Sequence, residues 1–157
     1  YWMTGAFIAA KSAPAREKIL ENLLEEVRDS HPNMMRKFAI AAGAVPTDRD
    51  AAVVFEPLTA VRLFIGRLSP VPILTTMAFF EGFIQRFMPY LADLAARQGS
   101  TEMEYTDVHG VCDVTHTEEL YKALGTEVEL SNGAAAKDDL FEGVRLLRSL
   151  IETIVVA

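Results

Sequence analysis

The sequence predicts an all-α fold, a single domain over residues 1–157 built as a bundle of about six or seven helices. Three observations support this prediction. Apolar side chains recur at helical spacing in several long segments. Short proline-, glycine- and serine-containing stretches such as "SHP" and "QGS" separate those segments. The only alternation typical of a strand lies within residues 108–116, where it is short and has helical flanks.

The segments between these breaks give the expected helices, over about residues 14–29, 31–43, 51–68, 72–97, 101–125 and 137–156. The first begins at Pro14, a residue that suits a first helical turn. Its apolar stripe, which we expect to face the core, consists of Ile19, Leu20, Leu23, Leu24 and Val27. Ser30 is a good N-cap for the second helix, and Gly43 ends it.

Prolines and polar residues mark the later helices. "VPTDRD" and "SPVP" are expected loops on either side of the third helix, which Pro57 should interrupt. Pro89 should kink the long, apolar fourth helix, and "QGS" ends it. Thr101 and Glu104 form a capping-box pattern at the start of the fifth. Gly125 is expected to stop that helix and to lead into a turn.

Composition argues against several classes of partner. The net charge is −7, and the basic residues are scattered among acids, so we expect no binding to nucleic acid or to anionic membranes. "LSPVPILTTMAFF", an uncharged run of 13 residues, is too short to span a bilayer. The single cysteine, Cys112, allows no internal disulfide, and the N-terminal stretch has no basic region of a signal peptide, so we expect a cytoplasmic protein. The start at Tyr1, without methionine, leaves open that a first helix is missing.

Three potential metal ligands share one stripe of the fifth helix, in "YTDVHGVCDVTH". Successive helical residues turn by about 100°, so Asp113 lies about 40° and His116 about −20° from His109. Tyr105, four residues before His109, joins the same stripe. Two imidazoles and a carboxylate suit Fe(II), Mn(II) or Zn(II). The alternative is that these residues bind no metal and form a polar patch, either solvated or buried.

Glu81 is the outstanding further ligand candidate, because it lies among phenylalanines in "TTMAFFEGFIQRF". An unpaired carboxylate buried there would cost several kcal/mol, and a metal cation is one partner that removes this cost. An ion pair with Arg62 or Arg86 is the alternative.

Together these residues resemble the haem-oxygenase-like di-iron oxidases and oxygenases, which are related in fold to TenA and the pyrroloquinoline-quinone-C proteins. That family carries His-x3-Asp-x2-His on its last core helix, one Glu on the middle helix, and a Glu followed by a His on the first. "NLLEEVRDSHPNMMRKFAIAAG" looks like the family's first such stretch, and the resemblance runs from about Asn22 to Leu124. The ligand set it implies is Glu26, His31, Glu81, His109, Asp113 and His116.

The resemblance implies an enzyme with two iron ions (manganese or a mixed pair being alternatives) that uses O2 to oxidise a small, partly apolar substrate. It implies His31, Glu26 and His116 on one ion, and Glu81, His109 and Asp113 on the other. The expected substrate pocket consists of Met77, Phe79, Phe80 and Phe83. Tyr105 is a candidate catalytic residue that donates a hydrogen bond or an electron. We expect a homodimer formed through the last helix.

One spacing departs from the family pattern. Glu26 and His31 are five residues apart, which is about 140° on an unbroken helix, so they cannot share one face. The sequence leaves three explanations open: a helix break at "DSHP", a ligand role for Glu25 instead, or loss of this half of the site.

Two other functions stay open. The first is a metal-free, TenA-type hydrolase or binder of a thiamin-like compound, which would rely on a pocket cysteine with carboxylates, a role for which Cys112 is badly placed. The second is an inactive helical interaction module. A metal-binding enzyme should lose iron on His109→Ala, whereas the TenA-type protein should respond to Cys112→Ala.

Overall fold

The computed structural model describes residues 1–132 and 139–156 and places seven helices in them. They are α1 (Trp2–Ala9), α2 (Ala13–Arg28), α3 (His31–Ala41), α4 (Asp48–Gly66), α5 (Pro70–Arg97), α6 (Glu104–Leu130) and α7 (Glu142–Val156). No strand occurs in this part of the chain. The predicted all-α fold is therefore confirmed.

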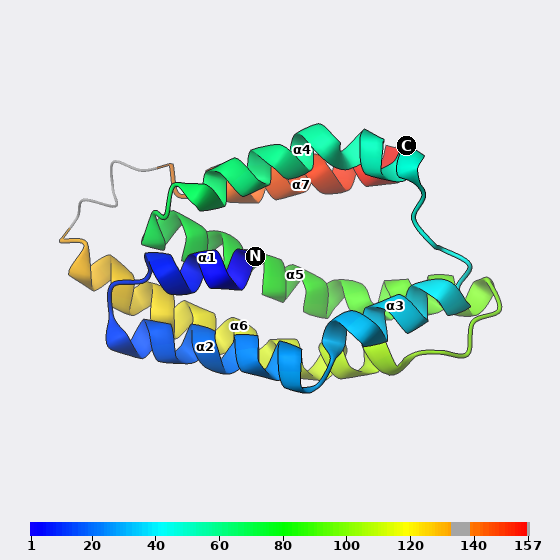
Figure 1. Ribbon diagram of the computed structural model, residues 1–157. Coiled ribbons are helices and arrows are strands. Elements are labelled where there is room, and N and C mark those ends of the chain that lie inside the picture. Colours follow the sequence, from blue (N-terminus) through cyan, green and yellow to red (C-terminus); the bar gives the residue numbers. More distant parts are fainter. Residues whose placement is uncertain (133–138, 157) are drawn as a thin grey trace.

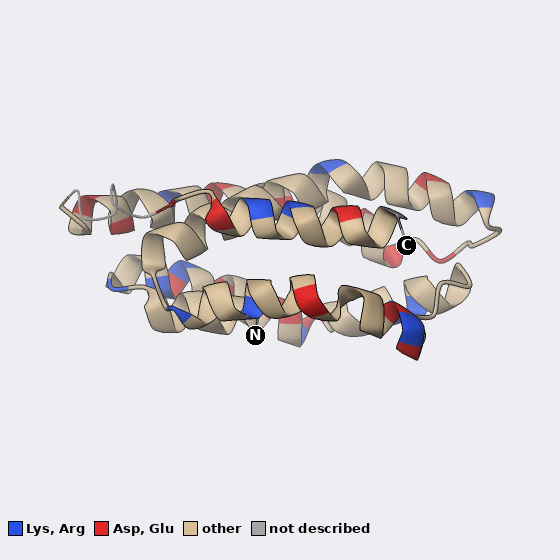
Figure 2. Ribbon diagram, turned by 90° about the horizontal axis from the view of Figure 1, so that it is seen from above, with Lys and Arg blue, Asp and Glu red and all other residues tan. Residues whose placement is uncertain are grey.

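The long helices α5 and α6 form the centre of the bundle (Figure 1). They run antiparallel, α2 lies along α6, and α3 continues beside the N-terminal half of α6. Helices α4 and α7 pair on the other side of α5, and α1 bridges α2, α4 and α5. Acidic and basic residues occur together along the same helices (Figure 2). None of the described helices is both long and apolar enough to cross a membrane.

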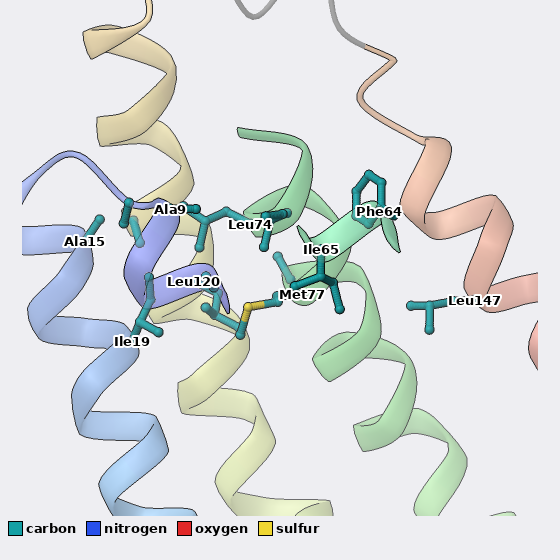
Figure 3. Packing of buried hydrophobic residues seen from close by; sticks show 14 of the residues in the cluster. Ala9, Ala15, Ile19, Phe64, Ile65, Leu74, Met77, Leu120 and Leu147 are labelled. Atoms are coloured by element: carbon teal, nitrogen blue, oxygen red, sulfur yellow. The ribbon is translucent and has the colours of Figure 1, made fainter. Parts of the chain in front are cut away.

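The hydrophobic core lies where α1 meets α2, α4, α5 and α6 (Figure 3). Ile19, Leu74 and Leu120 are completely buried there. At two places the backbone of a helix packs closely against side chains of neighbouring helices. A Cβ on Gly5 would clash with Ile65, and one on Gly143 would clash with α4 and α5 side chains, so glycine is what lets α1 and α7 sit so near the core.

The face that α2 turns inward differs from the predicted apolar stripe. Ile19 is buried as expected, but Leu24 is 54% exposed and Val27 70% exposed. Asn22 is buried in their place. The inward face carries polar side chains of the site described below, so apolar periodicity alone indicated the wrong face. The helix itself begins as predicted, with the Ser12 hydroxyl accepting a hydrogen bond from the Ala15 N–H at 3.0 Å.

Several predicted helix boundaries differ from those in the structure. Helix α1 was not expected. Helix α4 starts at Asp48 because Thr47 and Asp50 form a capping box, and it continues through Pro57. Helix α6 starts after Met103 without the predicted capping box and continues through Gly125. The predicted start of the last helix, Lys137, lies outside the described residues.

The continuation of α6 past Gly125 has a tertiary cause. Glu127, one half-turn later, is buried, and its Oε1 accepts hydrogen bonds from the N–H groups of Lys11 and Ser12 at 2.8 and 2.7 Å. This contact holds the last turns of α6 against the start of α2. Packing therefore outweighs the helix-stopping tendency of glycine.

Candidate metal centre

The α2–α3 junction brings Glu26 and His31 together. Helix α2 ends at Arg28, and Ser30 adopts the left-handed conformation with φ 57° before α3 begins at His31. The resulting change of direction places His31 Nδ1 2.7 Å from Glu26 Oε1. The helix break, one of the three explanations for the five-residue spacing, is thus present in the structure.

The first group of candidate ligands consists of Glu26, His31 and His109, each with a ligand atom within 4.8 Å of the others. The Nδ1–H of His109 donates to the Tyr105 carbonyl at 2.8 Å, which leaves its Nε2 toward Glu26 Oε1 at 3.9 Å. Because a carbonyl oxygen only accepts, this bond fixes the His109 tautomer with a free Nε2. Both imidazoles are buried, and their rings meet edge to face at 4.5 Å.

The second group consists of Cys112, Asp113 and His116, again within 4.8 Å of one another. Asp113 is only 1% exposed, and its Oδ1 lies 3.6 Å from His116 Nδ1. Two buried atoms of this group, Asp113 Oδ2 and His116 Nδ1, have no hydrogen-bond partner among the described residues. The other ring nitrogen of His116, Nε2, lies 2.8 Å from Glu25 Oε2. Glu25 thus reaches the site together with Glu26.

Glu81 joins these groups from α5. Burial, followed by the negative charge of Asp113, raises the pKa of this buried carboxyl to about 7, and Glu26 adds to the effect while His116 opposes it. Within the described part of the chain it forms no ion pair with Arg62 or Arg86. A buried carboxyl repelled by two others is suited to a bound cation.

The donor set fits a metal centre. Four helices, α2, α3, α5 and α6, supply three imidazoles and three carboxylates, a set that suits Fe(II), Mn(II) or Zn(II). Metal bonds of about 2 Å hold neighbouring ligand atoms about 3 Å apart, and the pairs above lie 2.7, 3.6 and 3.9 Å apart, so small side-chain shifts would bring them to this separation. A metal ion would also satisfy the two buried atoms that have no partner in the described part of the chain.

The grouping of the ligands differs from the expected division between two ions. The structure places His109 beside Glu26 and His31, and His116 beside Asp113. The reason is the break at Ser30, which turns His31 toward the N-terminal turn of the stripe, where His109 lies.

Tyr105 packs against the first group. Its ring centre lies 4.2 Å from that of His109 and 5.9 Å from that of Phe38. Burial and then the charges of Asp113, Glu26 and Glu81 raise the pKa of Tyr105 to about 12. The phenol is therefore protonated at neutral pH and can only lose its proton to a strong base.

The expected substrate pocket is divided. Phe79, Phe80 and Phe83 line one apolar cavity of about 280 Å³ between α5 and α7, whereas Met77 belongs to the hydrophobic core. Phe79 and Phe83 are each two residues from Glu81, so they lie about 160° around α5 from it. The helix itself thus separates this cavity from the candidate ligands.

A second, polar hollow of about 400 Å³ adjoins the ligands directly. It lies between α2 and α6 and is lined by Glu21, Glu25, Cys112, Thr115, His116 and Glu119. Sequence reasoning named Glu25 only as a substitute for Glu26. The two consecutive glutamates, Glu25 and Glu26, were the sequence signal that could have indicated a role for both. Adjacent residues on a helix point about 100° apart, so their side chains can reach two different neighbours.

A family model described as iron-containing redox enzyme matches residues 2–150. The chain belongs to this family. Its helical, haem-oxygenase-like fold and its redox function at the level of an iron-containing oxidoreductase agree with the resemblance seen in the sequence. No curated protein and no solved structure gives a match.

Proposed function

We propose that the chain is a non-haem di-iron oxidase or oxygenase that uses O2 on a small, partly apolar substrate. The observation that carries this is the presence of two ligand groups whose charges act on the buried Glu81, with buried atoms of Asp113 and His116 that have no hydrogen-bond partner among the described residues. Family membership supports iron as the metal.

The residues divide by group. Glu26, His31 and His109 would hold one ion, and Asp113 and His116 the other. Glu81 experiences the charges of both Asp113 and Glu26, so it would be available as a ligand to the bound metal. The iron pair, when bound, supplies the reduction of O2. The protein holds the ligand atoms at fixed separations in a largely buried site, and the protonated Tyr105 beside His109 offers a hydrogen-bond donor.

The metal-free, TenA-type function has less support. Burial and then Asp113 raise the pKa of the Cys112 thiol to about 12, and its Sγ–H points to Asp113 Oδ1 at 3.3 Å. A thiol in this state is a poor nucleophile at neutral pH.

Anaerobic loading with Fe(II), followed by mixing with O2 in an optical spectrometer, tests the proposal. We expect two irons per chain and a transient visible absorption. His109→Ala and Asp113→Ala should each lower the iron content while circular dichroism shows an intact helical fold. Val114→Ala, a half-exposed position on α6 between Asp113 and His116, is the matched control and should retain both irons. A folded wild-type protein that binds no iron would eliminate a di-iron function.

A further inference from the structure

Glu25 and Glu26 are neighbours on α2 but reach different histidines. Glu26 contacts His31 and approaches His109, whereas Glu25 Oε2 lies 2.8 Å from His116 Nε2. The two helices run antiparallel here, as the contact between Lys18 and Glu119 one to two turns further along also indicates. Glu25 thus meets α6 where the second ligand group lies.

The two ring nitrogens of His116 have different surroundings. Its Nε2 points to Glu25, which lines the outer polar hollow and whose side chain is 42% exposed. Its Nδ1 is fully buried, has no hydrogen-bond partner among the described residues, and lies 3.6 Å from Asp113 Oδ1. The ring therefore separates a partly hydrated carboxylate from the buried ligand atoms.

This arrangement decides which nitrogen is available to a metal. A carboxylate accepts hydrogen bonds and does not donate them, so the proton of a neutral His116 ring stays on Nε2 beside Glu25. The Nδ1 lone pair then faces Asp113. His109 has the opposite pattern, because the Tyr105 carbonyl holds its Nδ1–H and leaves Nε2 free.

The geometry points to Glu25 as a positioning residue that orients His116 so that Nδ1, not Nε2, binds the second metal ion. Glu25 itself stays outside the coordination shell. Carboxylates that accept the second N–H of a ligating histidine typically contribute 10- to 100-fold to metal affinity. This role rests on the proposed function, because it requires a metal ion at the buried groups.

Zn(II) is a suitable probe, because it is diamagnetic and does not react with O2. The chain has three histidines, so nitrogen NMR of the ¹⁵N-histidine-labelled, Zn(II)-loaded protein can resolve each ring. In the wild type we expect His116 to carry Zn(II) on Nδ1 and a proton on Nε2. Zn(II) bound to Nε2 would overturn the inference, because Glu25 would then be a neighbouring ligand.

Zn(II) titration of three variants provides the second readout. Glu25→Ala should weaken one of the two sites 10- to 100-fold. Glu25→Gln retains an oxygen acceptor and should restore part of that affinity, together with the wild-type His116 spectrum. Glu21→Ala, in the same hollow one turn earlier, should leave both sites unchanged.

The outcomes separate the two levels of the proposal. Unchanged Zn(II) affinity in Glu25→Ala, with wild-type binding intact, would overturn the role of Glu25 alone. A folded wild type that binds no Zn(II) would instead overturn the proposed metal centre, and the role of Glu25 with it.

Discussion

Glu81 shows how a single buried carboxyl links the candidate metal centre to the stability of the metal-free protein. Its pKa is about 7 in the folded chain and about 4.5 when unperturbed. Between about pH 4.5 and 7, the Glu81 carboxyl is therefore protonated in the folded state and ionised in the unfolded state. The stability this provides is fully present below about pH 4.5 and disappears as the pH rises through about 7.

We predict that Glu81→Gln removes this pH dependence. At pH 8 the metal-free variant should be more stable to urea than the metal-free wild type, by at most roughly 3 kcal/mol, since one pKa unit corresponds to about 1.4 kcal/mol. Near pH 4.5 the two should be similar. His116, whose pKa is raised to about 9 by Asp113, Glu25 and Glu81, also loses its charge as the pH rises, and it does so at somewhat lower pH in the variant, which lacks the Glu81 charge. A variant that is less stable than the wild type at pH 8 would contradict the cost assigned to Glu81.

At the scale of the helices, the break between α2 and α3 determines half of the candidate metal centre. Ser30 has φ 57°, a conformation that costs a non-glycine residue roughly 1 kcal/mol or more. The sequence alone predicted a helix boundary at "SHP". It could not predict the direction in which the chain continues after that boundary, because this direction depends on one backbone dihedral angle. The ligand stripe on α6 was predictable, because it needs only regular helix geometry.

Ser30 variants should separate strain from function. Ser30→Gly should preserve Zn(II) binding and raise the free energy of unfolding by up to roughly 1 kcal/mol. Ser30→Val should lower that free energy by roughly 1–3 kcal/mol and weaken Zn(II) binding, because a β-branched residue resists this conformation and the Glu26–His31 pair separates. Equal Zn(II) affinity in both folded variants would show that the conformation of Ser30 does not determine how Glu26 and His31 are placed.

The packing of α7 gives a second test at this scale. A Cβ on Gly143 would clash with Thr76 and Phe64, so Gly143→Ala should lower the free energy of unfolding by roughly 1–3 kcal/mol. Gly125 lies inside α6 with open space around it, so Gly125→Ala should stabilise the protein by roughly 0.5–1 kcal/mol. Chemical denaturation of both variants measures this difference, and equal effects would contradict the close approach of α7.

For the whole molecule, long-range contacts explain what sequence patterns did not reveal. The inward face of α2 was mispredicted because Asn22 and the candidate ligand Glu26 occupy positions that apolar periodicity assigns to the surface. The length of α6 was mispredicted because Glu127 contacts residues 115 and 116 positions away. Short motifs with helical spacing were visible in the sequence, whereas partners supplied by distant segments required the fold.

Glu127 therefore tests whether stability and metal binding are separable. Its carboxylate accepts from the buried Ser12 N–H and the partly buried Lys11 N–H just before α2, far along α6 from the stripe of candidate ligands. Glu127→Ala leaves those groups without this acceptor and should lower the free energy of unfolding by roughly 2–4 kcal/mol, at about 1–3 kcal/mol per unsatisfied group. Glu127→Gln keeps one oxygen acceptor and should lose less, and the exposed Glu129→Ala should change little. All three, when folded, should bind Zn(II) with wild-type stoichiometry. A selective loss of metal in folded Glu127→Ala would mean that the α1–α2 junction also holds the ligands in place.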